Sequence, residues 1–162
     1  MKLGKRIIII LLVSISCIGC DQSTKMLANE YLPKNEMFSY LNDSFRIGYA
    51  ENTGAFLGVG SELPGNLRFW VFVVFVGFVL VGLLVHLLVN SKHSALPLVG
   101  LALAFSGGLS NFYDRLVNDG AVVDFLNVGI GSVRTGIFNV ADMAITLGMV
   151  LVLYASCKKH DF

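Results

Sequence analysis

The sequence predicts a mainly α-helical membrane protein, with four transmembrane helices and a small β-sheet outside the membrane. Of its 162 residues, 55% are hydrophobic and only 14% are charged, whereas about 25% of the residues in an average soluble domain are charged. Four apolar runs each approach the roughly 20 residues that cross a bilayer. The length suits a single polytopic domain over residues 1–162. A net charge of +1 without a basic run excludes a nucleic-acid partner.

The first span is expected over residues 6–28. Positive residues precede an apolar run that ends in I-S-C-I-G-C, so this end also resembles a secretory signal peptide with a lipobox at Cys20. A lipid-anchored protein modified at Cys20 is therefore an alternative. Asp21 and Lys25 lie four residues apart, on one face of a helix, which favours a helix that continues past the cysteine. Because three further spans follow, we expect this helix to remain uncleaved.

The cysteines are Cys17, Cys20 and Cys157, all in apolar segments or at their ends. Cys17 and Cys20 have the spacing of a metal motif, but they lack a second pair or a nearby His. We therefore expect no disulfide framework, no metal and no cofactor.

Two outer loops separate the remaining spans, which are expected over residues 67–89, 95–115 and 137–157. In the first loop, residues 30–66, the stretches that begin at Phe45 and Ala55 have the apolar and aromatic content of short strands. Asn52-Thr53-Gly54 between them predicts a turn. The second outer loop is expected over residues 116–136.

Positive residues predict the orientation of the chain in the membrane. They are found near both ends and in the loop between the second and third spans: Lys2, Lys5, Arg6, Lys92, Lys158 and Lys159. The two longer loops mix positive with acidic residues. Because positive residues favour the cytoplasmic side, we expect both termini in the cytoplasm and both longer loops outside.

This topology brings the rare polar residues of the chain to one level, the outer membrane interface. They come from the outer ends of the first, third and fourth spans and from the outer loops: Asp21, Lys25, Asn52, Asn111, Asp114, Arg115, Asp124, Asn139 and Asp142. Asp142 falls five residues after Ile137, hence about 8 Å along the expected helix. Asn139 is expected on the same face, within reach of Asp142.

Two carboxylates held near each other tend to share a proton, as Asp124 and Asp142 would here. Such a pair can activate water with one acid and protonate a leaving group with the other, so the sequence predicts hydrolysis of the aspartic type. Simpler explanations are a helix-dipole interaction for Asp142, an interfacial Asp114–Arg115 ion pair and a turn at Asp124. A small proton-coupled membrane transporter is a further alternative, although relay acids usually lie nearer the bilayer midplane.

Five motifs in order closely resemble those of the lipoprotein signal peptidase family, also called signal peptidase II. They are D-Q-S-T-K at Asp21, N-T-G-A-F at Asn52, G-G-L-S-N-F-Y-D-R at Gly107, V-V-D-F at Val122 and F-N-V-A-D at Phe138. The resemblance covers essentially the whole chain. Two positions depart from the family pattern: Phe56 directly follows Ala55, where a second alanine is usual, and Ser110 stands where a glycine is usual.

The resemblance implies a metal-free aspartic peptidase of the bacterial cytoplasmic (inner) membrane, with its active site at the outer leaflet. It implies cleavage of prolipoproteins just before a diacylglyceryl-modified cysteine, with inhibition by globomycin. The catalytic acids of the family map to Asp124 and Asp142. The residues that hold the site and the substrate map to Asp21, Lys25, Asn52, Gly54, Asn111, Arg115 and Asn139. The outer loops resemble the small sheet cradle of the family and a flexible segment over the site.

Overall fold

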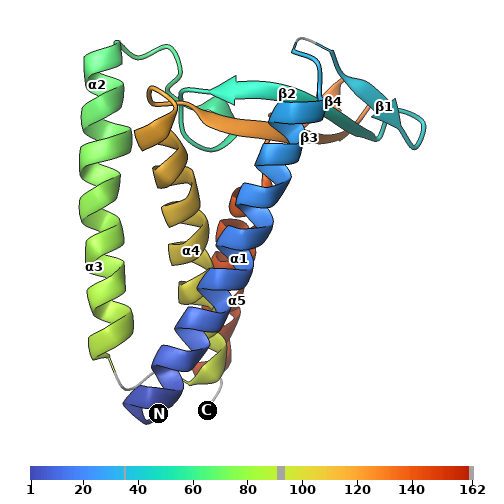
Figure 1. The fold of residues 1–162 in the computed structure, drawn as a ribbon. Coiled ribbons are helices and arrows are strands. Elements are labelled where there is room, and N and C mark those ends of the chain that lie inside the picture. Colours follow the sequence, from blue (N-terminus) through green and yellow to red (C-terminus); the bar gives the residue numbers. More distant parts are fainter. Residues whose placement is uncertain (35, 91–93, 161–162) are drawn as a thin grey trace.

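The computed structural model describes residues 1–34, 36–90 and 94–160, and within them it confirms the predicted fold class. Four helical rods are long and apolar enough to cross a membrane: α1 Leu3–Tyr31, a rod over Gly65–Val89, α4 Ala95–Val117 and α5 Val140–His160. Both termini lie at one end of the bundle and the sheet covers the other end (Figure 1). Lys92, used above to orient the chain, lies outside the described residues.

The second rod consists of three consecutive segments, α2 Gly65–Phe69, a π-helical stretch Trp70–Phe75 and α3 Val76–Val89. π-Helical turns inside α-helices are rare and frequently mark functional sites. This one lies near the sheet end of the bundle (Figure 1), and it buries Phe72 and Val73 toward α4.

Glycines let α4 and α5 approach closely. A Cβ atom on Gly100 would lie 2.7 Å from the carbonyl oxygen of Gly148, and a Cβ on Gly107 would collide with the carbonyl of Ala141. Small residues at such contacts are typical of helix pairs in lipid. Elsewhere on the bundle large apolar side chains face outward, for example Ile15 and Phe78, which are 69% and 73% exposed. This outer surface suits hydrocarbon, in agreement with four membrane spans.

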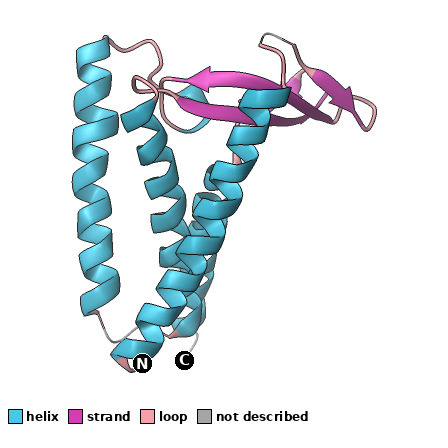
Figure 2. Ribbon diagram, viewed as in Figure 1, coloured by secondary structure: helices cyan, strands magenta, loops and turns pink. Residues whose placement is uncertain are grey.

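Four antiparallel strands form one sheet in the order β1-β2-β3-β4 (Figure 2). Their bounds are β1 Phe38–Tyr40, β2 Phe45–Asn52, β3 Val122–Ile130 and β4 Val133–Arg134. The strand predicted from Phe45 is confirmed. The strand predicted from Ala55 is wrong, because Phe56–Gly58 is a 3₁₀ turn in which Leu57 has φ 58° and Gly58 has φ 82°. The long partner of β2 is instead β3, from the second outer loop.

Candidate active site

The β2–β3 pairing places Asp124 above the helices. In this register Asn52 lies opposite Val122 and Ala50 opposite Asp124, with an irregularity between Ile47 and Ala50. Asp124 therefore lies in a regular strand and not in a turn. Its side chain is 1% exposed. Asn52 Nδ2 donates to Asp124 Oδ2 at 2.9 Å, so the last residue of β2 supplies one of the partners of this acid.

The start of α5 places Asp142, and it differs from the prediction. The helix begins at Val140 and not near Ile137, so Asn139 precedes the helix and Asp142 is its third residue. The backbone N–H of Asp142 donates to Asn139 Oδ1 at 2.9 Å, and the backbone N–H of Asn139 donates to Asp142 Oδ2 at 3.2 Å. This reciprocal pair is a capping box. Asp142 thus lies at the mouth of the helix, about 4.5 Å nearer the outside than it would if the helix began as expected, which is three residues at 1.5 Å each.

Asn139 also joins the two acids. Its Nδ2 donates to Asp124 Oδ1 at 2.7 Å, while its backbone N–H contacts Asp142. Asn111 provides a hydrogen bond to the other oxygen of Asp142, because its Nδ2 donates to Asp142 Oδ1 at 2.9 Å. Both acids are nearly inaccessible, with 1% exposure for Asp124 and 5% for Asp142. The carboxylates that the sequence separates by a strand and a loop are therefore linked through one residue, Asn139, which uses its side chain for Asp124 and its backbone N–H for Asp142.

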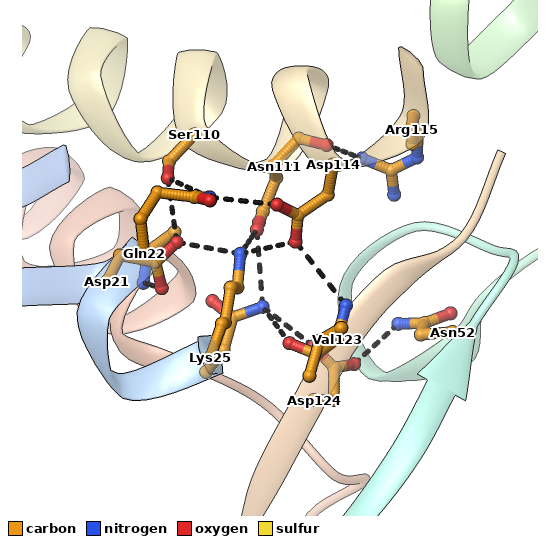
Figure 3. A network of polar contacts seen from close by, with 12 residues as sticks. Asp21, Gln22, Lys25, Asn52, Ser110, Asn111, Asp114, Arg115, Val123 and Asp124 are labelled. Carbon is orange, nitrogen blue, oxygen red and sulfur yellow. Dashed lines mark hydrogen bonds and ion pairs between the residues drawn. The ribbon is translucent and has the colours of Figure 1, made fainter. Parts of the chain in front are cut away.

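Behind the acids, Lys25 occupies the centre of a buried ionic cluster (Figure 3). Its Nζ lies 2.7 Å from Asp21 Oδ2, 2.8 Å from Asp114 Oδ2 and 2.8 Å from Asn111 Oδ1. These three contacts use all three N–H donors of the ammonium group. Because Asn111 accepts from Lys25 through its oxygen, its amide nitrogen points toward Asp142. The cluster thereby fixes the orientation of a direct neighbour of the acids.

Arg115 and Gly54 close the network on its other side. Arg115 Nη2 donates to the carbonyl of Gly54 at 2.5 Å, and the Gly54 N–H donates to Asn52 Oδ1 at 2.9 Å. Asn52 then contacts Asp124. The structure therefore joins every site residue predicted from the sequence into one chain of polar contacts: Asp21, Lys25, Asn52, Gly54, Asn111, Arg115, Asp124, Asn139 and Asp142.

Burial controls the titration of Asp124. Removal from water raises the pKa of this carboxyl to about 7, because burial disfavours its charged form. The hydrogen bonds from Asn52 and Asn139 act in the opposite direction, and the nearby charge of Asp142 adds to the increase. Asp124 can therefore retain a proton near neutral pH, which acid–base chemistry by a carboxyl pair requires.

Sequence reasoning did not assign two participants in this network, Gln22 and Ser110, to the site. Gln22 Nε2 donates to Asp114 Oδ1 at 2.8 Å and to Ser110 Oγ at 2.9 Å. Ser110, one of the two departures from the family pattern, donates to Asp21 Oδ2 at 2.7 Å. The simpler alternative of an interfacial Asp114–Arg115 ion pair is wrong, because Asp114 pairs with Lys25, which lies on α1. The available signal was the helical spacing of Gln22, three residues before Lys25, which puts the two side chains on one face of α1.

A pocket of about 230 Å³ reaches Asp124 from outside, between the end of β2 and the 3₁₀ turn. Asn52, Thr53, Leu57 and Ile137 line it with Asp124. Among residues 1–34, 36–90 and 94–160, no group of three His, Cys, Asp or Glu side chains lies close enough to hold a metal ion. The arrangement can thus bring a polar substrate group and water to a pair of linked carboxyls.

Comparison with known proteins identifies relatives over nearly the full chain. The Peptidase_A8 profile, described as signal peptidase (SPase) II, matches residues 13–158. The lipoprotein signal peptidase of Staphylococcus haemolyticus (strain JCSC1435) is 32% identical over 158 residues, which covers 98% of this chain and 96% of its own. The lipoprotein signal peptidase of Borreliella burgdorferi (strain ZS7) is 36% identical over 144 residues, with 86% and 84% covered.

Solved structures agree with these relatives. A bacterial membrane enzyme determined by the in meso method at 2.3 Å resolution superposes with a TM-score of 0.77 at 29% identity, covering 97% of this chain and 90% of its own. A second, determined by the same method at 1.9 Å, gives a TM-score of 0.72 at 28% identity, covering 94% and 92%. The four-helix arrangement with its sheet is therefore shared across these chains.

Proposed function

The chain belongs to the signal peptidase II family, so it is a membrane aspartic peptidase that cleaves the signal peptides of prolipoproteins, and we propose that Asp124 and Asp142 are its catalytic pair. One observation carries this assignment: Asn139 links the two carboxyls at the mouth of α5, with its side-chain Nδ2 donating to Asp124 and its backbone N–H donating to Asp142. The remaining members of the network, Asp21, Lys25, Asn52, Gly54, Asn111 and Arg115, hold this pair and the substrate. Hydrolysis by such a carboxyl pair requires neither a metal nor a cofactor.

The proposed mechanism divides one proton between two acids. The ionised carboxylate takes a proton from water while the protonated carboxyl donates a hydrogen bond to the scissile carbonyl. The resulting hydroxide attacks the carbon of the scissile carbonyl. The tetrahedral intermediate collapses when the amine nitrogen accepts a proton from the carboxyl that deprotonated the water, and the amine leaves. A pKa near 7 at Asp124 supports this division, because one proton then remains on the pair at neutral pH. The apparent pKa values belong to the pair and not to either acid alone.

The substrate is a prolipoprotein, and we place the cut just before its diacylglyceryl-modified cysteine. The acyl chains remain in lipid against apolar helix faces while the scissile bond reaches Asp124 at the interface. Globomycin-type inhibitors would occupy the same site. In this multi-pass bacterial membrane enzyme, the positive residues at both ends support cytoplasmic termini, which would put the sheet and the acids at the outer leaflet.

Cleavage of a diacylated lipobox peptide by the purified protein in detergent tests this proposal. Asp124→Asn and Asp142→Asn should each lower kcat by at least about 10²-fold, because each removes half of the acid–base pair. Asp43→Asn is the matched control, since Asp43 pairs with Arg46 on the sheet, and it should leave activity unchanged. A chelator should have no effect. Full activity in either dyad variant would refute the assignment.

A further inference from the structure

A second pocket, of about 320 Å³, lies between the outer end of the α2–α3 rod and α4. Its walls combine apolar side chains, including Phe72 and Leu116, with two guanidinium groups, Arg68 and Arg115. Thr53 lines this pocket and also the pocket that reaches Asp124. The two cavities therefore share Thr53 as a wall, next to Asn52 and its hydrogen bond to Asp124.

Both arginines have side-chain N–H donors without a hydrogen-bond acceptor among the described residues. Arg68 contacts Thr53 Oγ1 at 2.6 Å and the carbonyl of Ser61 at 3.2 Å, and both bonds come from Nη1. Arg115 lies over the ring of Phe72, with 5.6 Å between its Cζ and the ring centroid. Its Nε is buried and has no hydrogen-bond partner among the described residues. An unpartnered buried donor is costly, and both guanidinium groups line the pocket, so a ligand that supplies acceptors suits it.

The depth and charge of the pocket limit what that ligand is. Phe69 and Trp70 are 54% and 62% exposed beside it, as aromatic residues are at a membrane–water interface. A ligand that enters between the α2–π-helical segment and α4 therefore comes from lipid and carries its polar group at this depth. Asp119 also lines the pocket, and its negative charge disfavours a phosphate. A neutral group with carbonyl acceptors fits better.

We propose that this pocket holds the glycerol diester of the substrate cysteine, with Arg68 and Arg115 donating to its two ester carbonyls. This inference rests on the proposed function and names the part of the enzyme that recognises the lipid. The acyl chains then run along Phe72 and Leu116 into the bilayer, while the thioether end of the glycerol lies at Thr53, beside Asp124. Selection of lipid-modified cysteines thus depends on hydrogen bonds from the arginines as well as on membrane depth.

Two peptides of identical sequence test the proposal, one with a diacylglyceryl (diester) cysteine and one with the matching dialkylglyceryl (diether) cysteine, which lacks ester carbonyls. The wild-type enzyme should cleave the diester with a kcat/KM about tenfold higher, the size expected for hydrogen bonds from charged donors. In Arg68→Gln this ratio of kcat/KM values should fall toward 1. In Arg68→Lys the ratio should lie between the wild-type value and 1. Arg46→Gln, an arginine of the sheet, should keep the wild-type ratio.

Because the ratio compares two substrates on one preparation, partial unfolding of a variant cancels from it. A wild-type ratio of 1, or an unchanged ratio in Arg68→Gln, would overturn the inference while leaving the peptidase assignment intact. Failure of the wild-type enzyme to cleave either peptide would instead contradict the proposed function.

Discussion

Asn139 performs two tasks with one side chain. Its Oδ1 caps the backbone N–H of Asp142, and its Nδ2 contacts Asp124. The first task stabilises the start of α5, as N-cap residues generally do, and the second sets the geometry of the acids. The two tasks use different atoms, so substitutions can separate them.

Asn139→Ala should lose both contributions. We expect a loss of about 1 kcal/mol in the free energy of unfolding, the typical effect of a missing N-cap, and a loss in kcat of about 10²-fold, because misplaced catalytic groups cost about that much. Asn139→Ser should restore the stability but not the activity, since a serine hydroxyl caps well and cannot reach Asp124. Thermal unfolding and peptide cleavage measure the two effects. Wild-type activity in Asn139→Ser would contradict the bridging role.

Asn52 should tune the pH dependence. Its hydrogen bond favours the ionised form of Asp124 and opposes the increase in pKa caused by burial. Asn52→Ala therefore raises the pKa further. Because the pair needs its shared proton, activity falls as pH rises through the upper apparent pKa, and this alkaline limb should move to higher pH in the variant. A pH–rate profile measures it, with the exposed Asn66→Ala as control. A shift to lower pH would contradict the assignment.

At the scale of elements, the α4–α5 contact depends on glycine. In Gly100→Ala the new Cβ meets the carbonyl of Gly148 at 2.7 Å, so the helices must separate, which typically costs about 1–3 kcal/mol. Gly82→Ala on α3 is the matched control, because a Cβ there meets nothing within 4 Å, and alanine favours a helix over glycine by up to about 1 kcal/mol. Thermal unfolding in detergent should give a Tm above that of the wild type for Gly82→Ala and a Tm below it for Gly100→Ala. Equal effects would contradict the close packing.

The helices were the predictable elements, because length and hydropathy are local properties of the sequence. The strand from Phe45 was predictable for the same reason. The partner of that strand was not, since the pairing of β2 with β3 joins Asn52 to Val122 across two membrane spans. The segment after Gly54 has strand-like composition, but the left-handed backbone at Leu57 and Gly58 turns it into a 3₁₀ coil. Local composition does not reveal such a backbone.

At the scale of the whole molecule, one buried cluster holds α1, α4, α5 and the sheet together. Lys25 pairs with Asp21 and Asp114, and Asp21 also accepts the backbone N–H of Ala141 at 2.8 Å. Asp114 accepts the backbone N–H of Val123 in β3 at 3.4 Å. The sequence predicted that these residues share a depth, because they lie at the outer ends of their helices. It could not predict which atoms pair, since that depends on the rotation of each helix about its axis.

Lys25→Met should therefore destabilise the protein far more than a surface substitution. The variant leaves two buried carboxylates without their cation, and breaking a buried pair in this way costs about 3–5 kcal/mol. Lys34→Met is the matched control, because the Lys34–Glu51 pair is exposed, at 68% and 53%, and exposed pairs contribute little. The free energies of unfolding measure the difference. Equal losses would show that the cluster does not carry this stability.

The span of this cluster has a consequence for biosynthesis. Asp21 and Lys25 emerge from the ribosome together and enter the bilayer as a neutral couple on α1. Asp114 follows with α4, and Ala141 arrives only with α5. The ionic centre of the enzyme is thus completed only when α5 is inserted, and a chain halted before α5 carries Asp21 into the membrane without the backbone N–H of Ala141 that it accepts in the folded enzyme.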